Sequence, residues 1–399
     1  MLFIICFGFT LAFFVQIVRA DAWPQWRGPN RDGISKETGW RAEWPSAPEK
    51  VWQANVGVGY SSEAIVNGRL YTMGNLDETD FVYCLDANTG KEIWKHDYAC
   101  SSKDPNGYPG TRCTPTVDGD RVFTVSREGH LFCLSATDGK VLWTKEYKKD
   151  FGAKVPTWGF AGSPLVEKNL MLVEPGGLNA SVVALNKQTG ALVWKHGNDG
   201  PGYSSLIAYD YNRQRNLAVF AKEAIVGRAM AGGTELWRFP WKTSYGVNAA
   251  TPIVVDDKVF ISSGYNFGCA LLQFSSHPPK VLWQNKNMRN HVNSCVLYQN
   301  HLYGFDDNEL KCLAFDTGAV KWGNKSFGKG SLMLADGKLI VYSDNGRLAV
   351  VEASPESFKQ ISSAQILGGR STWSVPVLAN GKIYCRSLEN LVCLDVKTK

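Results

Sequence analysis

The chain has 399 residues, of which 44% are hydrophobic and 20% charged, with 43 Lys and Arg against 37 Asp and Glu. The formal charge of +6 is small for this length and the basic residues are scattered, which excludes a basic block or stripe of the kind that binds nucleic acid. The composition is that of an ordinary soluble protein, and the length alone would suggest two or three domains.

The chain opens with an apolar run from Met1 to Ile17, followed by Val18-Arg19-Ala20. Small or aliphatic residues at 18 and 20 fit a signal-peptidase cut before Asp21, although no Lys or Arg precedes the run. The alternative is an uncleaved membrane anchor. Cys6 lies inside the run and not after it, which argues against a lipid anchor. We expect residues 1–20 to be a signal peptide and the protein to be exported to the periplasm or cell envelope, without a transmembrane domain after cleavage.

One short unit returns along most of the chain. It reads Cys84-Leu-Asp-Ala-Asn-Thr-Gly-Lys-Glu-Ile-Trp94, and further copies, two of them worn, end at Trp143, Trp194, Trp237, Trp283 and Trp322. A small apolar residue ends one strand, an Asx/Thr/Gly cluster turns the chain, and an apolar pair leads into a Trp on the next strand. Each copy is therefore expected to be a β-hairpin with an aromatic anchor.

The anchors are spaced like the blades of a propeller. Intervals of 39 to 51 residues separate Trp52, Trp94, Trp143, Trp194, Trp237, Trp283 and Trp322. Periods of about 40 to 50 residues with four short strands each are typical of propeller blades and not of helical solenoids. Asn-Gly and Asp-Gly turns between short apolar runs mark the other strands and leave little room for helices.

The number of copies predicts eight blades. A degenerate seventh hairpin runs from Val350 to Phe358, with Phe358 in place of the Trp, and an eighth begins at Leu391. The anchor of the eighth copy would fall beyond Lys399, whereas Trp52 lies on an anchor strand with no hairpin before it. We expect an all-β, eight-bladed propeller of four-stranded antiparallel blades over residues 49–399, closed by the N-terminal strand, with an extension over 21–48 packed on it.

The repeats resemble a known family. The Leu-Asp-Ala-x-Thr-Gly-Lys-x-x-Trp units are similar to the pyrroloquinoline quinone (PQQ) repeats and tryptophan-docking motifs of eight-bladed quinoprotein propellers. The segments 23–33, 156–164, 239–245 and 286–291 resemble the secreted bacterial PQQ-binding-like β-propeller repeat proteins often labelled BamB-like. The resemblance covers essentially all of the mature chain and implies the fold, but it implies little about activity, because that family is mostly defined by its repeats.

Six of the ten cysteines fall into two groups. Those at the first position of the hairpin unit are expected to be small buried core residues: Cys84, Cys133, Cys312 and Cys393. Cys100 and Cys113 flank an insertion outside the repeat, and in an oxidising compartment they could form a disulfide or remain free thiols. No Cys and His spacing typical of a metal site is present, so no metal ligands are predicted.

The loops that lead into the innermost strands should form the rim of the central channel. They carry candidate ligand-binding residues: Arg112, Trp158, Asn248, Arg289, His291, Lys329, Arg370 and Trp373. Cations around an aromatic platform would suit a planar polycarboxylate such as PQQ, or a peptide strand with acidic groups. The competing interpretation is a solvated rim without a ligand.

Two functions of different classes compete. The leading hypothesis is a monomeric, non-enzymatic propeller that binds a protein or peptide in the cell envelope, as the resemblance to BamB-like proteins implies. The alternative is a PQQ-dependent dehydrogenase of an alcohol or sugar, with PQQ and Ca²⁺ as cofactors. Such an enzyme needs several oxygen ligands for Ca²⁺ and an Asp base, but only Glu63 and Glu174 lie near the loops. No catalytic residue is identified.

Overall fold

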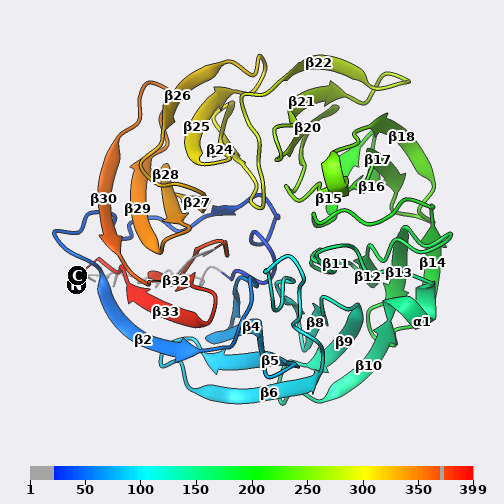
Figure 1. Cartoon of the computed structure of the whole chain (residues 1–399), viewed down its shortest axis with the longest axis horizontal. Helices are drawn as coiled ribbons and strands as arrows, with labels where there is room; N and C mark the ends of the chain where they lie inside the picture. Colours follow the sequence, from blue (N-terminus) through cyan, green and yellow to red (C-terminus); the bar gives the residue numbers. More distant parts are fainter. Residues whose placement is uncertain (1–21, 369–372, 399) are drawn as a thin grey trace, which may run out of the picture.

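The computed structural model describes residues 22–368 and 373–398; the expected signal peptide and Arg370 lie outside this range. The described chain forms eight antiparallel sheets arranged in a ring (Figure 1). Helix in this range is confined to α1 (Tyr147–Phe151) and the 3-10 turn η1 (Ser244–Gly246). Neither of these described helices has the length or apolar character needed to span a bilayer. The predicted eight-bladed all-β propeller is confirmed.

Each blade runs from its innermost to its outermost strand. Blades 1 to 4 consist of β3 (Ala64–Val66), β4 (Arg69–Leu76), β5 (Thr79–Asp86), β6 (Glu92–Ala99); β7 (Thr116–Asp118), β8 (Arg121–Val125), β9 (His130–Ser135), β10 (Val141–Glu146); β11 (Leu165–Glu167), β12 (Leu170–Val173), β13 (Val182–Asn186), β14 (Leu192–His196); and β15 (Ile207–Tyr211), β16 (Gln214–Phe220), β17 (Ala224–Ala229), β18 (Glu235–Pro240). Blades 5 to 7 consist of β19 (Ile253–Val255), β20 (Lys258–Ser263), β21 (Gly268–Gln273), β22 (Lys280–Asn285); β23 (Val296–Tyr298), β24 (His301–Asp306), β25 (Glu309–Ala314), β26 (Val320–Asn324); and β27 (Gly330–Ala335), β28 (Lys338–Ser343), β29 (Arg347–Glu352), β30 (Gln360–Gln365).

The eighth blade is built from both ends of the chain. Its inner strands are β31 (Val377–Ala379), β32 (Lys382–Arg386) and β33 (Asn390–Asp395), and its outermost strand is β2 (Glu49–Asn55). In the β2–β33 pair, Trp52 lies opposite Cys393, as Trp94 lies opposite Cys84 in the first blade. The N-terminal strand therefore closes the ring, as the sequence predicts.

A β-bulge recurs between the two outer strands of all eight blades. In the first blade Cys84 pairs with Trp94 but Leu85 pairs with Glu92, so that Ile93 is the extra residue. A bulge bends the strand and increases its twist. Trp94 is buried, whereas Ile93 remains 43% exposed at the perimeter of the ring.

The bulge aims each tryptophan at the next blade. The Trp94 ring lies against Gly139 in the hairpin turn of the second blade, so close that a Cβ on this glycine would lie 2.6 Å from the ring. The indole Nε1 of Trp94 donates to the carbonyl of Ala136 at 3.0 Å. Equivalent bonds to the next blade are made by Trp52, Trp143, Trp283 and Trp322. The Trp and the Gly of the repeat thus form an interlock between neighbouring blades.

The seventh hairpin differs from the prediction. The register of β29 and β30 places Ser362, not Phe358, at the anchor position. Phe358 precedes β30 and packs edge-on against Trp322 of the sixth blade at 5.8 Å. Ser362 Oγ donates to the carbonyl of Ala42 at 2.6 Å, and Trp40 is buried in the core cluster that includes residues of blades 7 and 8. The N-terminal extension therefore fills the place of the missing tryptophan.

The same extension closes the central channel. The N-terminal segment crosses the middle of the ring (blue in Figure 1), and β1 (Ile34–Ser35) pairs in parallel with β27. We call residues 23–41 the plug. It hydrogen-bonds to each of the eight blades, through Ile65, Val117, Pro164, Leu206, Thr251, Cys295, Leu334 and Val396. A single segment thus ties all the blades together at the axis.

Two buried arginines hold the plug in place. Arg27 donates to the carbonyl of Cys295 at 2.6 Å, and Arg31 donates to that of Leu206 at 3.1 Å and to that of Pro164. Burial lowers the pKa of Arg27 to about 10 and that of Arg31 to about 9. Both guanidinium groups therefore stay charged at neutral pH and satisfy backbone carbonyls that directly precede the innermost strands of blades 3, 4 and 6.

Candidate functional site

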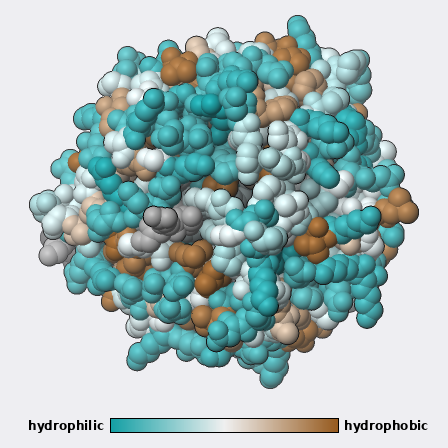
Figure 2. Space-filling model, viewed as in Figure 1, coloured by the Kyte–Doolittle hydropathy of each residue, from teal (hydrophilic) through white to brown (hydrophobic). Residues whose placement is uncertain are grey.

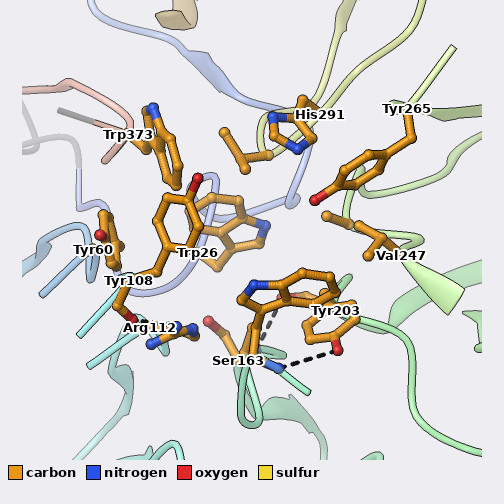
Figure 3. Close-up of a pocket in the computed structure, with 15 residues that line it drawn as sticks. Trp26, Tyr60, Tyr108, Arg112, Ser163, Tyr203, Val247, Tyr265, His291 and Trp373 are labelled. Carbon is orange, nitrogen blue, oxygen red and sulfur yellow. Dashed lines mark hydrogen bonds between the residues drawn. The ribbon is translucent and has the colours of Figure 1, made fainter. Parts of the chain in front are cut away.

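A pocket opens on the axis above the plug and is lined by eight rings and one guanidinium group (Figure 3). It has a volume of about 150 Å³. We call it the axial pocket. Its lining consists of Trp26, Tyr60, Tyr108, Arg112, Trp158, Ala161, Ser163, Tyr203, Ser205, Val247, Ala249, Tyr265, His291, Val292 and Trp373. Seven of the eight loops that lead into the innermost strands contribute to this lining, and Trp26 is the contribution of the plug.

One wall is a stack of three aromatic rings. Trp373 lies between Tyr60, at a centroid distance of 5.3 Å and an angle of 24°, and Tyr108, at 5.2 Å and 30°. Near-parallel rings at these distances attract each other beyond the burial of their surface. The stack therefore joins the last blade, the first blade and the insertion before the second blade into one wall.

The opposite wall is organised around Trp158. Its ring lies 6.4 Å from Tyr265 in a stacked arrangement and 5.9 Å from Tyr203 in an edge-on arrangement. Tyr245, in η1, lies edge-on to Trp158 at 6.0 Å and is 70% exposed. Tyr245 also has a φ of +64°, which is rare for a bulky residue. The aromatic surface therefore continues from the pocket onto the rim.

The charge in the pocket comes from Arg112. Its guanidinium donates to Asp104 at 3.0 Å and lies 5.7 Å from the Tyr60 ring centre. Asp104 also pairs with Arg127 at 3.4 Å, so two cations share one carboxylate and one positive charge is left over. Burial, with a further contribution from Arg127, lowers the pKa of Arg112 to about 10, which keeps it charged at neutral pH.

His291 is a neutral donor. Its Nδ1 lies 3.2 Å from Lys329 Nζ, and because an ammonium group can only donate, the imidazole proton must be on Nε2. Burial, and then the charge of Lys329, lower the pKa of His291 to about 4. Lys329 itself pairs with Asp307 at 3.1 Å. The imidazole therefore presents an N–H group and no charge at neutral pH.

The structure brings four of the eight candidate residues together at the axial pocket. Arg112, Trp158, His291 and Trp373 line the axial pocket, whereas Asn248, Arg289 and Lys329 do not, and Arg370 lies outside the described residues. Asn248 is fully buried and donates to the carbonyl of Ala221 at 2.7 Å. Arg289 is held by Asp306 at 2.6 Å. Lys329 reaches the pocket only through its bond with His291.

Five aromatic residues of the lining are not among the candidates from the sequence: Trp26, Tyr60, Tyr108, Tyr203 and Tyr265. Trp26 belongs to the plug, Tyr108 to the insertion between Cys100 and Cys113, and Tyr265 to the turn between β20 and β21. Tyr60, Tyr108 and Tyr203 lie in loops that lead into innermost strands, whereas Trp26 and Tyr265 lie outside such loops. The aromatic residue in the Gly-Tyr-Pro segment of the insertion was the available signal for Tyr108.

The possible disulfide is not formed. All nine cysteines of the described residues are free and buried, including Cys100 and Cys113. The Sγ of Cys113 donates to the carbonyl of Thr114 at 3.3 Å. Burial raises the pKa of both thiols, to about 12 for Cys100 and about 11 for Cys113, which keeps them protonated. These two cysteines therefore serve as core residues like those of the repeat.

The residues of the axial pocket do not fit PQQ with Ca²⁺. No carboxylate or carboxamide is among its lining, and Glu63 and Glu174 lie outside it. Among the described residues, no group of three or more His, Cys, Asp and Glu side chains could hold a metal ion. The volume of about 150 Å³ suits a single ring, since a cavity of similar size takes one benzene molecule, and PQQ has three fused rings.

Comparisons with known proteins agree with this architecture. A curated relative, Outer membrane protein assembly factor BamB from Yersinia pestis, is 25% identical over 371 residues, which covers 87% of this chain and 88% of the relative. The solved structure of BamB from Moraxella catarrhalis has a TM-score of 0.62 at 15% identity and covers 89% of this chain and 99% of that one. A europium-containing methanol dehydrogenase has a TM-score of 0.68 at 13% identity, over 93% of this chain and 90% of that one.

The two solved structures are similar in fold alone, because their identities are low. Family membership rests on the sequence. The family model described as Outer membrane protein assembly factor BamB matches residues 78–324, from the second half of the first blade to the end of the sixth. This chain therefore belongs to the BamB-like family of PQQ-repeat β-propellers.

Proposed function

We propose that this protein is a non-enzymatic scaffold that binds a protein or peptide partner in the cell envelope, through the axial pocket. The observation that carries the proposal is the composition of that pocket, which combines eight rings with one cation and contains no carboxylate, thiol or metal-ligand set. Concave, mostly apolar sites with a few polar groups are typical of ligand binding.

Two further observations support a partner of some size. The pocket opens next to Tyr245, which is 70% exposed, and an exposed aromatic beside a pocket adds contact surface for a large partner. The curated relative that matches 87% of this chain is named as an assembly factor. Export to the envelope rests on the apolar run at residues 1–17. The protein is proposed to act as a monomer without nucleic acid or a bound cofactor.

The face of the molecule drawn in Figure 2 offers no large apolar patch that would compete with the pocket. Figure 2 shows a largely hydrophilic face on which apolar side chains stand singly or in small groups. Single exposed apolar residues are normal for soluble proteins and do not mark an interface. At the perimeter of the ring, the exposed apolar residues beside the bulges form small pairs, such as Leu192 and Val193, each 52% exposed.

The test is to select peptides that bind the mature protein from a displayed random library. Ala161→Trp is the matched control, because it fills the pocket with a ring and removes none of the aromatic walls. The proposal expects peptides that bind the wild type and lose binding on Ala161→Trp. Peptides that bind both proteins equally would contradict the pocket as the site. A parallel titration with PQQ, with and without Ca²⁺, tests the dehydrogenase alternative; stoichiometric binding that depends on Ca²⁺ would overturn the scaffold.

A further inference from the structure

We infer that the axial pocket takes one aromatic side chain of an extended peptide, with a carboxylate next to that side chain directed at Arg112. The inference rests on the proposed function and names the chemistry of the partner. Three properties of the pocket carry it: its size, the character of its walls and the sign of its charge.

The size limits the inserted group to one ring. A volume of about 150 Å³ is below the range of about 300 to 1,000 Å³ typical of pockets for drug-sized ligands. A free ligand of a single ring has few atoms with which to gain affinity. A side chain of a longer chain can use the pocket as an anchor point while its neighbours contact the rim. The small volume therefore favours a polypeptide over a free small molecule.

The walls favour an aromatic side chain. The Tyr60, Trp373 and Tyr108 stack forms one wall, across the pocket from Tyr265 (Figure 3). Trp158 stacks on Tyr265 and completes the other wall. Aromatic pairs in offset or edge-on arrangements gain about 0.5–1.5 kcal/mol beyond the burial of their area. An inserted aromatic ring would make such pairs with both walls at once, whereas an aliphatic side chain would gain only from burial.

The polar groups favour an acceptor with negative charge. Arg112 and Arg127 share the single carboxylate of Asp104, which leaves one positive charge beside the pocket. On the other side, Lys329 is paired with Asp307, so the unmatched cation is on the Arg112 side. His291 presents an N–H group. A neutral sugar needs acceptors for its hydroxyl groups, and the side chains of the lining offer only hydroxyls in that role.

The test is a set of synthetic octapeptides in a Gly-Ser background whose two central residues are Phe-Asp, Phe-Asn, Phe-Lys or Ala-Asp. Binding is measured by fluorescence anisotropy at low and high salt. We expect Phe-Asp to bind at least tenfold more tightly than Phe-Asn or Ala-Asp, and the preference for Asp to shrink as salt screens the charge. Equal affinities for the four peptides would overturn the inference.

Variants of the protein separate charge from structure. Arg112→Gln should abolish the preference for Asp over Asn, and Arg112→Lys should keep most of it. Arg289→Gln, which removes a rim cation outside the pocket, should leave the preference unchanged. A preference that survives in Arg112→Gln would contradict the role of this residue. Thermal melts of each variant confirm that it is folded.

Two competitors identify other ligand classes. Phenylacetate supplies a ring and a carboxylate without a peptide, and cellobiose supplies a neutral sugar; each is added at millimolar concentration to the Phe-Asp complex. Unlabelled Phe-Asp peptide is titrated in parallel. If phenylacetate or cellobiose displaces the labelled peptide at the same concentration as the unlabelled peptide does, the peptide assignment is overturned. If library peptides depend on the pocket but show no aromatic or acidic preference, this inference fails while the proposed function stands. If no peptide depends on the pocket, both fail.

Discussion

The tryptophans of this protein have two different structural roles. At the blade interfaces, Trp94 and most of its equivalents sit on a turn glycine of the next blade, and most of the set donate the indole N–H to a backbone carbonyl there. In the axial pocket, Trp158 and Trp373 pack against other side-chain rings and border open space. The same residue type is thus used for closing the ring and for binding. Local sequence distinguishes the two, because only the first kind stands in the repeat.

The largest effect should come from removing an interface tryptophan. Trp94→Ala leaves a cavity between two blades and frees the carbonyl of Ala136, and we expect a loss of about 3–5 kcal/mol in unfolding free energy, measured by urea denaturation. Trp194 is half-buried and its Nε1 has no partner among the described residues. Trp194→Ala should therefore cost less, by about 1 kcal/mol or more. Equal losses would mean that the indole bond contributes nothing to the interlock.

The glycine under the interface tryptophan tests the same contact from the other side. Gly139 has a φ of +72° and no space for a Cβ beneath Trp94. Gly139→Ala should cost about 2–4 kcal/mol, from the left-handed backbone and from overpacking together. Gly119→Ala, at a turn with a φ of +59° and no atom within 4 Å, isolates the backbone cost of about 1–2 kcal/mol. Denaturation midpoints that match for the two variants would argue against tight docking.

Removing a pocket tryptophan should weaken binding and change stability little. Trp158 is partly exposed and belongs to no blade interface, so Trp158→Ala should change the unfolding free energy by only about 1 kcal/mol. The same variant should lose the binding of pocket-dependent peptides, measured by anisotropy. A loss of stability as large as that of Trp94→Ala would break the distinction between the two sets.

Acid should act on the axial pocket through His291. The pKa of His291 is lowered to about 4 in the folded protein, from about 6.5 when exposed, so the folded state resists protonation and this group's contribution to stability is lost as the pH falls from about 6.5 to 4. The fluorescence of Trp373, 6.2 Å from His291, should change near pH 4. In His291→Gln this change should be absent; its persistence would show another origin.

Much of the fold was predictable because the interlock is local in sequence. The Gly and Trp of one hairpin lie four residues apart, as in Gly90 and Trp94, and their spacing repeats along the chain. The plug could not be found in this way. Arg31 bonds carbonyls more than 130 residues away, and no periodic pattern marks such a contact. The prediction of Phe358 as the anchor of the seventh blade was wrong for a related reason, since Ser362 occupies this position and bonds to the distant Ala42.

The pocket was predictable in part. The rule that loops into the innermost strands form the rim located Arg112, Trp158, His291 and Trp373, because it follows from the blade topology. It also selected Arg289, whose side chain is turned aside by Asp306. Side-chain direction depends on neighbours from other strands, and a single sequence does not show which cation is already paired.

The central claim is that ligands meet the pocket tryptophans and leave the interface tryptophans untouched. Fluorine NMR of protein labelled with 5-fluorotryptophan, with resonances assigned through single Trp→Phe variants, measures both sets in one spectrum. Titration with a library-selected peptide should shift the resonances of Trp158 and Trp373 and leave those of Trp94 and Trp143 in place. Shifts confined to the interface tryptophans would place the binding site at the perimeter and contradict the account.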